Sequence, residues 1–434
     1  MFQKLLISII DKLIMVFRNI VFFSPSKITG GAEYYFIRLA EYVADHYKDY
    51  RVYYTEFQDG FGRKVISSPN VYFINYEEGV NVTIPENSVI CISSHLVYQI
   101  QKLFSYNRNN SVFMMWFMHY RHLSTYFTMG DYFKVGRKFR AKVGKHIEKL
   151  TDLGVLQFLG NIGYLKLSQQ FLFSYHPINA LPIPISTEKY GVDVAINRRI
   201  NDVVRFCWLG RLDKEKSKNI LTYMNELEYV NKTKKVSLSI IGVGPAEAIL
   251  KHQAKRYPFK IEFVGEKREK ELDSFIRENV DIGLASGTSS MEFALRKVPV
   301  IQDWLLDRVY QAGKRDTYYL YGQTSIISEI TSTKFRFENM GTFYSKFSDL
   351  MDNYIVRCEE AYKNVMLCSV SNCCEKFISA VSTLEQSDMK ECYEHIDALA
   401  FYVWKAKNNW KEKLHLYRIF VPLCKILSIE PAAI

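Results

Sequence analysis

The segment VVRFCWLGRLDKEK, residues 203–216, decides the fold class and places the first candidate site. Its apolar part, 203–209, has the length and composition of a buried strand, and a polar run begins at Gly210. That run contains two cations, Arg211 and Lys216. The planar fork of Arg can bind an anion through two hydrogen bonds and Lys adds a point charge, so the pair suits a diphosphate. The alternative is an ordinary solvated loop.

The strand at 203–209 is one of a long series of short apolar runs. In the second half of the chain the others occupy 236–242, 261–265, 280–285 and 298–301. In the first half they occupy 19–23, 51–57, 71–76, 89–93, 112–119, 155–159 and 171–175. Helical patterns, the first at 31–46, separate several runs, and this alternation predicts mostly parallel sheets covered by helices. A chain of 434 residues is also too long for one core. We therefore predict an α/β protein with two Rossmann-like domains facing a cleft, followed by C-terminal helices.

The domain boundaries follow from a change in composition between the two series. Residues 177–201 contain Pro182, Pro184 and little periodicity, as is usual for an interdomain linker. After about residue 340 the pattern becomes helical. The predicted division is into domains at 1–187 and 188–385 and a helical tail at 386–434, which packs on the first domain or contacts a membrane.

The net charge of +11 indicates an anionic partner, either nucleic acid, a membrane surface or a phosphorylated substrate. The sequence has no recognition helix, zinc spacing or RNP-like aromatic motif, which argues against nucleic acid. The densest basic stretch has one acid, Glu148, and fits either an anionic membrane surface or a solvated face. Its bases are Lys134, Arg137, Lys138, Arg140, Lys142, Lys145 and Lys149.

Cysteine usage and hydropathy predict the compartment. The eight cysteines lack paired CxxC spacing and are interpreted as reduced thiols. No stretch approaches the roughly 18 uncharged apolar residues of a membrane-spanning helix. The amphipathic pattern at 1–17 is broken by Asp11 and Lys12 and predicts a packed or interfacial helix, not a signal peptide. We expect a cytoplasmic protein, either free or peripheral on the inner face of the cytoplasmic membrane.

Two glycine-containing motifs follow predicted strands. GGAE at 30–33 opens the helix at 31–46, where backbone can approach a phosphate or sugar closely; a tight turn is the alternative. SGTSSME at 286–292 opens a second helix whose N–H groups suit a phosphate. In the same segment Ser289 and Glu292 also fit a capping box, in which Glu292 serves only the helix N-terminus.

A third glycine motif, GVGPAE at 242–247, is similar to a dinucleotide fingerprint but departs from it. The position of the third glycine is Glu247, and the motif does not follow the first strand of the chain. A turn near a ligand cleft is the better interpretation.

In order and spacing, these segments resemble glycosyltransferase family 4 of the GT-B superfamily. The matching segments are GGAE at 30–33, WLGRLDKEK at 208–216, SIIGVGP at 239–245, IEFVGE at 261–266 and GTSSMEFALRKVPVI at 287–301. The resemblance implies an N-terminal acceptor-binding domain and a C-terminal nucleotide-sugar-binding domain. It further implies retaining transfer of a sugar from a nucleotide-diphosphate sugar to a polysaccharide or lipid-linked acceptor, in bacterial capsule or lipopolysaccharide synthesis.

The resemblance also assigns residue roles. Arg211 and Lys216 would stabilise the departing diphosphate, Glu292 would hold the ribose hydroxyls, and His119 would contact the transferred sugar. As a lone histidine, His119 fits a structural role as well. Other donor-binding residues would be Gly30, Gly31, Gly210, Gly244, Gly265, Glu266, Ser286, Gly287, Thr288 and Ser289. The sequence has no DxD-type metal motif after a first-domain strand, and no metal or other cofactor is expected because the cation pair supplies positive charge.

One departure from the family pattern concerns the donor sugar. The family usually carries two glutamates eight residues apart, and here the partner position of Glu292 is Leu284. The contact to the sugar hydroxyls therefore lacks an owner, unless Ser286 or another group replaces it. The alternative is a degenerate, non-catalytic GT-B subunit that acts as a scaffold or sugar-binding partner.

Overall fold

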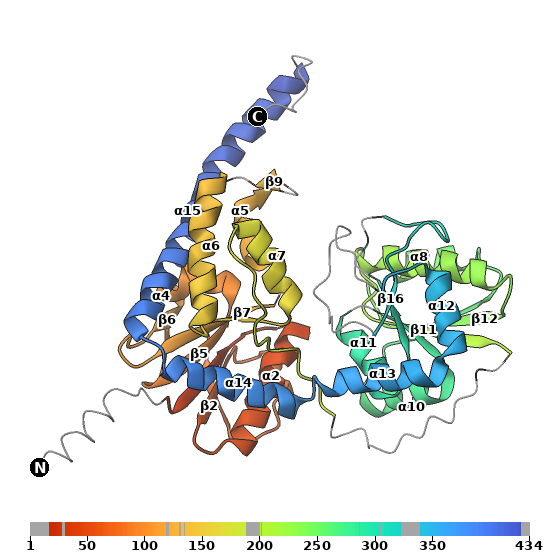
Figure 1. The fold of residues 1–434 in the computed structure, drawn as a ribbon, viewed down its shortest axis with the longest axis horizontal. Helices are drawn as coiled ribbons and strands as arrows, with labels where there is room; N and C mark the ends of the chain where they lie inside the picture. Colours follow the sequence, from red (N-terminus) through yellow and green to blue (C-terminus); the bar gives the residue numbers. More distant parts are fainter. Residues whose placement is uncertain are drawn as a thin grey trace, which may run out of the picture. The chain divides into compact units, whose positions relative to one another are not determined.

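The computed structural model describes residues 17–27, 31–118, 121–129, 132–133, 135–187, 200, 202–285, 287–303, 306, 308–322 and 339–426. The chain divides into two compact units, which are coloured along the sequence in Figure 1. Unit 1 comprises residues 1–181 and 374–434, and unit 2 comprises residues 182–373.

Unit 1 is built on a six-stranded sheet in which all strands are parallel. Their spatial order is β10 (Leu156–Phe158), β7 (Val112–Phe117), β5 (Ser88–Ser93), β1 (Asn19–Phe23), β2 (Arg51–Glu56) and β3 (Val71–Asn75). The chain moves outward from β1 through β2 to β3, then returns to the other side of β1 at β5. This reversal is a topological switch point, where ligands of doubly wound sheets bind beyond the carboxyl ends of the strands.

Helices connect the strands of unit 1. They are α2 (Gly31–His46), α3 (Phe61–Val65), η1 (Ser94–Gln99), α4 (Ile100–Leu103), α5 (Arg121–Phe127), α6 (Arg137–Asp152) and α7 (Asn161–Phe171). Two small sheets pair β4 (Val82–Thr83) with β6 (Phe104–Ser105) and β8 (Thr128–Met129) with β9 (Tyr132–Phe133). Helix α2 has the predicted bounds. Its residues Phe36, Leu39 and Val43 recur at helical spacing and are all buried, which explains why this segment forms a helix packed on the sheet.

Unit 2 has a second six-stranded sheet, in the order β13 (Lys260–Gly265), β12 (Val236–Ile241), β11 (Val204–Leu209), β14 (Ile282–Ala285), β15 (Val300–Gln302) and β16 (Tyr319–Leu320). Only β16 is antiparallel to its neighbour. Side chains alternate between the two faces, so Phe206 and Trp208 enter one core and Cys207 the other. The chain reverses direction across this sheet between β11 and β14, which is the switch point of unit 2.

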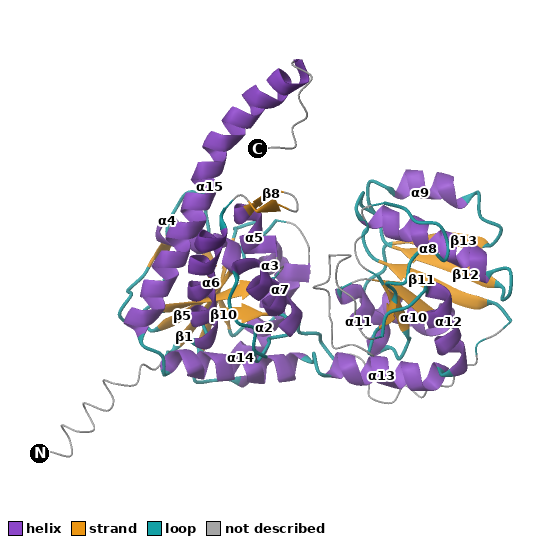
Figure 2. Ribbon diagram, turned by 45° about the horizontal axis from the view of Figure 1, so that its top comes forward, coloured by secondary structure: helices purple, strands orange, loops and turns teal. Residues whose placement is uncertain are grey.

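Helices cover both faces of the unit 2 sheet, as the purple and orange elements of Figure 2 show. One face packs against α8 (Lys216–Val230), α9 (Glu247–Ala254) and α12 (Phe343–Asp352). The other packs against α10 (Glu269–Asn279), α11 (Thr288–Leu295) and α13 (Tyr354–Met366). The predicted doubly wound α/β architecture is confirmed.

The last two helices return the chain to unit 1. The boundary between the units falls within α14 (Val370–Glu385), and α15 (Met389–Ile426) packs on α6, α5 and η1. The prediction placed residues 374–385 in the second domain, whereas the structure places them in unit 1. The reason is local packing, since the Phe377 ring lies 5.7 Å from that of Phe22 and 5.9 Å from that of Trp116.

The strand predicted at 171–175 is wrong. Phe171 ends α7, and Leu172 follows it with a left-handed backbone (φ 60°) that stops the helix. The segment then continues without strand pairing, and Leu172 and Tyr175 are exposed. Another prediction, the helix at 1–17, lies outside the described residues except for Phe17.

The described cysteines are buried and are not joined in disulfides, in agreement with the prediction. They are Cys91, Cys207, Cys358, Cys368, Cys373, Cys374 and Cys392. Burial raises the pKa of the Cys91 thiol and raises that of Cys392 to about 11, so neither forms a thiolate at neutral pH. Within the described part of the chain, no helix combines the length and the apolar character that crossing a bilayer requires.

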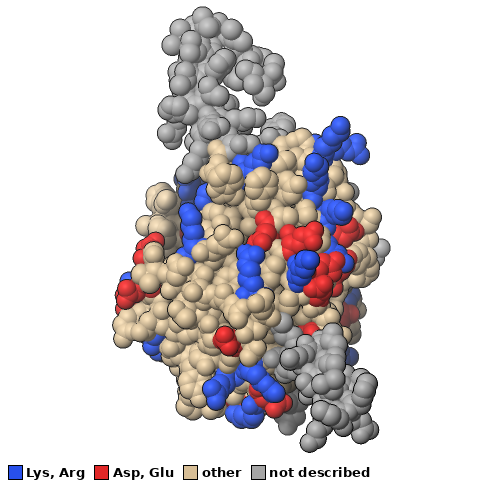
Figure 3. Space-filling view, turned by 90° about the vertical axis from the view of Figure 1, so that its left-hand side faces the viewer, with Lys and Arg blue, Asp and Glu red and all other residues tan. Residues whose placement is uncertain are grey.

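The predicted basic surface is smaller in the structure than in the sequence. Arg140 Nη1 donates to Gln170 O at 3.1 Å, and Lys149 Nζ forms a 2.9 Å ion pair with Glu391. Lys134 lies outside the described residues. The exposed bases of α6 are Arg137, Lys138, Lys142 and Lys145. On the face of the molecule in Figure 3, Lys and Arg side chains are interspersed with Asp and Glu.

Helix α15 is attached to α6 by a pair of histidines. His146 Nδ1 lies 2.8 Å from His395 Nδ1, so one ring donates the only proton between them and the other accepts it. Burial, and next the proximity of His395, lower the pKa of His146, with Lys145 lowering it further and Glu394 raising it.

We expect the stability of unit 1 to fall on mild acidification. Because the folded pKa of His146 lies below the ordinary value of 6.5, the neutral His146 ring stabilises the protein fully above pH 6.5. This contribution is lost as the pH falls through the folded pKa. Urea unfolding at pH 7 and pH 5 should show a smaller decrease for His146→Gln than for the wild type. His252→Gln, which alters an exposed histidine of unit 2, should behave as wild type; equal decreases in all three proteins would contradict the prediction.

Candidate functional site

Three loops at the carboxyl ends of β11, β12 and β13 are joined by backbone hydrogen bonds. Gly210 N donates to Ile241 O at 3.1 Å, and Gly242 N donates to Gly265 O at 2.9 Å. Leu212 N donates to Val243 O at 3.0 Å, and Ala246 N returns a bond to Leu212 O at 2.8 Å. The predicted site residues Gly210, Gly244 and Gly265 therefore belong to one rigid edge of the unit 2 sheet.

Glycine is required at two positions of this edge. Gly244 has φ 158°, and a Cβ there would lie 2.5 Å from Leu212 O, so a side chain would separate the first two loops. Gly287 has φ 67° at the start of α11 and lies beside Thr288 and Ser289, the first residues of the helix. Both glycines keep backbone exposed where a helix or loop can meet an anion.

Arg211 and Lys216 provide positive charge at the same edge. The Arg211 side chain is 75% exposed, and its Nε lies 3.7 Å from Asp213 Oδ2. Lys216 is half-buried at the first turn of α8, and a Cβ on Gly210 would lie 3.3 Å from its Nζ. None of the described carboxylates forms an ion pair with Lys216. Burial, and next the charge of Arg211, lower the pKa of Lys216, whereas Asp213 raises it. The pair lacks full internal compensation and therefore favours an anionic ligand.

Asp213 sets the position of Lys216. Its Oδ1 accepts from Lys216 N at 2.8 Å and its carbonyl oxygen accepts from Ser217 N at 2.9 Å, so Asp213 fixes the turn that leads into α8, whose N-cap is Glu215. Two residues of the predicted cation loop thus have distinct tasks, because Asp213 holds the turn before the helix and Lys216 presents the charge.

Glu292 does not form the capping box that the sequence allowed. The N-cap of α11 is Gly287, without a side-chain cap, and Glu292 Oε2 instead accepts from Arg296 Nη1 at 2.9 Å. Leu284, at the position of the family's first glutamate, is wholly buried in the core of unit 2. Its predicted substitute, Ser286, lies outside the described residues.

Glu266 is an exposed member of the predicted donor site. It follows Gly265 at the end of β13 and forms an exposed ion pair with Arg268, with Arg268 Nη2 at 2.7 Å from Glu266 Oε1. Exposed pairs of this kind add little to stability. Glu266 is therefore available to a ligand at the sheet edge without a large structural cost.

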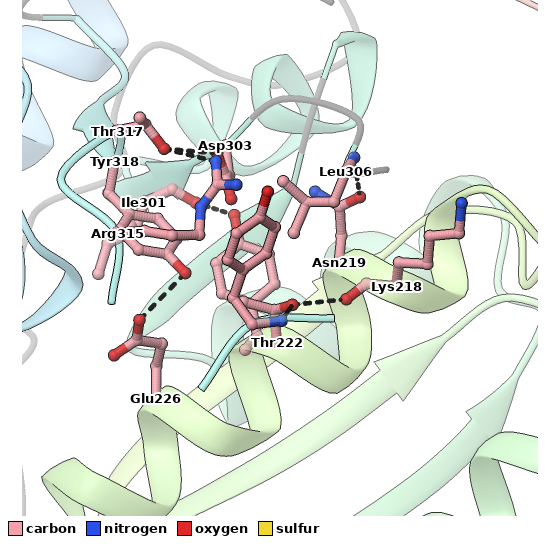
Figure 4. A network of polar contacts seen from close by, with 12 residues as sticks. Lys218, Asn219, Thr222, Glu226, Ile301, Asp303, Leu306, Arg315, Thr317 and Tyr318 are labelled. Carbon is pink, nitrogen blue, oxygen red and sulfur yellow. Dashed lines mark hydrogen bonds and ion pairs between the residues drawn. The ribbon is translucent and has the colours of Figure 1, made fainter. Parts of the chain in front are cut away.

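A buried polar network that sequence reasoning missed joins α8 to the loop that follows β15 (Figure 4). The helix presents Asn219, Thr222 and Glu226 on one face, and each accepts a backbone N–H of the loop after β15. The donors are Leu306, Tyr310 and Gly313, at 3.1, 3.0 and 3.0 Å. Burial is the main cause that raises the pKa of Glu226. The spacing i, i+3, i+7 places the three residues on one helical face, but nothing in the sequence distinguishes a buried polar face from a solvated one.

An ion pair closes the same network. Arg315 Nη2 donates to Asp303 Oδ1 at 2.7 Å and to Thr317 Oγ1 at 2.5 Å, and both charged side chains are almost fully buried. Tyr318 Oη donates to Glu226 Oε1 at 3.3 Å. The loop is thereby fixed to the helix that carries Lys216.

The predicted residues of unit 1 are only partly described. Gly30 and His119 lie outside the described residues, and Gly31 begins α2 directly after the loop that follows β1. Sequence reasoning missed a cluster of described residues at the carboxyl end of β5, next to the switch point. Ser93 Oγ lies 2.7 Å from His95 Nδ1 and 3.3 Å from His122 Nδ1, so one hydroxyl orients two imidazoles. Burial lowers the pKa of His95 and keeps it neutral.

Glu56 joins the segment after β1 to the segment that follows β2. Its carboxylate is buried and accepts three backbone N–H groups, from Ser26 and Phe57 on Oε1 at 2.8 and 2.9 Å and from Gly62 on Oε2 at 2.7 Å. A carboxylate with only acceptor atoms suits three donors, and no neutral side chain of this size can replace it.

Glu56→Gln should destabilise the protein. The amide turns one acceptor into a donor that faces backbone N–H groups, and we expect a loss of about 2–4 kcal/mol in the free energy of unfolding. Urea titration followed by circular dichroism measures the loss. Glu78→Gln, at an exposed site nearby, should change it little, and equal stability of the two variants would contradict the assigned role.

No protein-family model matches the sequence, and no curated protein resembles it closely enough to be matched. A solved glycosyltransferase from Rickettsia africae ESF-5 superimposes with a TM-score of 0.54 at 11% identity, over 86% of this chain and all of that one (100%). The chain has the GT-B glycosyltransferase fold.

A second solved structure agrees with this fold. It is the lipopolysaccharide outer core galactosyltransferase WaaB in its apo form, with a TM-score of 0.50 at 12% identity, over 84% of this chain and 99% of that one. At these identities the likeness establishes the fold, and the chemistry has to be argued from the side chains of this chain.

Proposed function

We propose that the protein is a glycosyltransferase that uses a nucleotide-diphosphate sugar as donor and binds it at the carboxyl edge of the unit 2 sheet. The observation that carries this proposal is the cation pair Arg211 and Lys216. Both lie beside the glycine loops of β11 and β12, at the switch point where doubly wound sheets bind nucleotides. Family 4 membership is part of the proposal and is supported by the order of the quoted motifs.

The chemistry follows from where the charges lie. As the bond between the sugar's anomeric carbon and the diphosphate oxygen breaks, negative charge grows on the leaving group, and Arg211 and Lys216 stabilise it electrostatically. The acceptor oxygen forms the new bond on the same face of the sugar, and its proton passes to the departing diphosphate. The backbone of Gly287, Thr288 and Ser289 binds phosphate oxygens, and Glu292 accepts the ribose hydroxyls.

The proposal includes the acceptor and the cofactor requirement. The acceptor is a polysaccharide or lipid-linked glycan of a bacterial surface, and His119 contacts the transferred sugar. WaaB, which shares the fold, is named as a lipopolysaccharide galactosyltransferase. The reaction proceeds without a metal because the cation pair takes over charge stabilisation. Turnover that is unchanged by a chelator is the expected result, and strong stimulation by manganese would contradict it.

A thermal-shift and turnover screen tests the donor assignment. The protein is titrated with UDP, GDP, ADP and their common sugar conjugates, with Glu292→Ala as the matched variant. Stabilisation by one nucleotide that the variant loses would support the site in unit 2. Absence of any response would favour the alternative of a non-catalytic scaffold, which Leu284 motivates.

Peripheral binding to an anionic membrane is also proposed. Arg137, Lys138, Lys142 and Lys145 are exposed on α6, and α15, which packs on α6, exposes Phe401 and Trp404 by 53% each. Exposed aromatic rings next to bases suit the interface of an anionic bilayer, where each base contributes about 1 kcal/mol.

Vesicle flotation tests this surface. Replacing the four α6 bases by Gln should release the protein from vesicles of phosphatidylglycerol and phosphatidylcholine. A control protein with the same change in charge replaces Arg51, Lys64, Lys102 and Lys390, which are exposed elsewhere in unit 1. The control should still float, and equal behaviour of the two proteins would contradict a specific surface.

A further inference from the structure

A fully buried arginine lies directly behind the proposed ribose-binding carboxylate. Arg296 follows the last residue of α11, and its side chain is 0% exposed. Its Nη1 donates to the backbone oxygen of Glu292 at 2.6 Å and to Glu292 Oε2 at 2.9 Å. A buried guanidinium is costly unless its charge is paired, so the surrounding carboxylates are part of why it is there.

The pairing extends from α11 to α10. Arg296 Nε lies 3.0 Å from Asp273 Oδ1, and Asp273 Oδ2 in turn lies 2.8 Å from Arg277 Nε. The result is an alternating chain of charges in the order Arg277, Asp273, Arg296 and Glu292. Two positive and two negative groups hold one another's orientation, and the chain ends on the carboxylate of Glu292.

This arrangement leaves Glu292 with one committed and one available oxygen. Oε2 is bound to Arg296, whereas a carboxylate has acceptor capacity on both oxygens. The side chain of Glu292 is 25% exposed, in contrast to Arg296. A ligand can therefore reach Glu292 but not the arginine that orients it.

We propose that Arg296 is a positioning residue that orients Glu292 so that Oε1 accepts the ribose hydroxyls of the bound nucleotide. The inference rests on the proposed function, because it assumes that Glu292 binds ribose. A carboxylate held in advance loses little conformational entropy on binding, and it is left unpaired when the ligand lacks hydroxyls. The ion pairs thus give the site a preference for ribose over dideoxyribose, beyond joining α10 to α11.

The test compares ribose preference in matched variants. The dissociation constants of UDP, GDP and ADP and of their 2′,3′-dideoxy forms are measured by calorimetry. The readout is the dissociation constant of the dideoxy form divided by that of the ribose form, for the nucleotide that binds most tightly. Glu292→Ala sets the ratio of a site without the carboxylate. In Arg296→Gln we expect the wild-type ratio to fall about tenfold, the value of one lost oriented hydrogen bond. Arg277→Gln keeps the contact between Arg296 and Glu292 and should keep the ratio.

The outcomes separate this inference from the proposed function. A wild-type ratio in Arg296→Gln, with Glu292→Ala reduced, would overturn the positioning role and leave the ribose contact intact. If Glu292→Ala binds the ribose nucleotide as tightly as the wild type does, and also binds the dideoxy nucleotide as tightly as the wild type does, Glu292 does not contact the ribose. That result would overturn the ribose contact and the inference with it. If Arg296→Gln does not fold, Arg296→Lys keeps the charge without the planar fork. It should give an intermediate ratio, and a full ratio there would also overturn the proposal.

Discussion

Lys216→Ala should lower turnover on the order of 100-fold, the usual cost of removing one group that stabilises transition-state charge. The ammonium is half-buried beside Gly210, and none of the described carboxylates pairs with it, so its charge is available to the leaving diphosphate. Burial and Arg211 lower the pKa of Lys216, so the charge is lost at lower pH than for an ordinary lysine. Turnover should therefore decline on the alkaline side as the pH rises through that pKa.

A nearby lysine provides the matched control for this prediction. Lys214 lies in the same loop and is exposed, so Lys214→Ala should retain near-wild-type turnover. Initial rates with saturating donor measure both variants, and thermal unfolding checks that they are folded. Full activity of Lys216→Ala would remove Lys216 from the catalytic assignment.

Arg315→Leu should cost about 3–5 kcal/mol in the free energy of unfolding, because removing one partner of a buried ion pair leaves the other charge uncompensated. Asp303 is almost fully buried, with Arg315 Nη2 at 2.7 Å from its Oδ1. The substitution also removes the cation–π contact of Arg315 with Tyr310, whose ring centroid lies 4.5 Å from the guanidinium carbon. Denaturant unfolding at neutral pH measures the effect.

Three further variants show whether charge or packing causes the loss. Arg308→Leu changes an exposed arginine of the same loop and should leave the free energy of unfolding nearly unchanged. The double variant Asp303→Leu, Arg315→Leu removes the uncompensated charge and should recover part of the stability. The single variant Asp303→Leu is measured as well. If the loss in free energy of unfolding of the double variant equals the sum of the losses of the two single variants, the ion-pair explanation is contradicted.

The fold was predictable from the sequence because its strands and helices have strong local patterns. The helix at 31–46 has the predicted bounds, and β11 is one residue shorter than the predicted strand. The strand predicted at 171–175 is wrong for a physical reason. Phe171 is the last residue of α7, and the apolar residues after it pair with no strand. Leu172 there adopts a left-handed conformation and is exposed, so an apolar residue did not indicate burial.

The candidate site was predictable only where its residues are close in sequence. Arg211 and Lys216 share one loop, and the structure places them beside the glycines that the sequence singled out. The missed groups depend on contacts between distant elements. Asp273 lies in α10 and Arg296 follows α11, and His122 of α5 contacts Ser93 at the end of β5. Two local patterns indicated the buried ion pairs, because Glu292 and Arg296 are four residues apart and so are Asp273 and Arg277.

The composition of unit 1 from two separate stretches of chain has a consequence for biosynthesis. As the polypeptide leaves the ribosome, residues up to 181 emerge without α14 and α15, and the rings of Phe22 and Trp116 have no Phe377 to cover them. Unit 2, which is continuous, can complete its core first, whereas the earlier segment waits for the last part of the chain. Nascent chains stalled before residue 374 are therefore expected to recruit chaperones through unit 1, although it is made first.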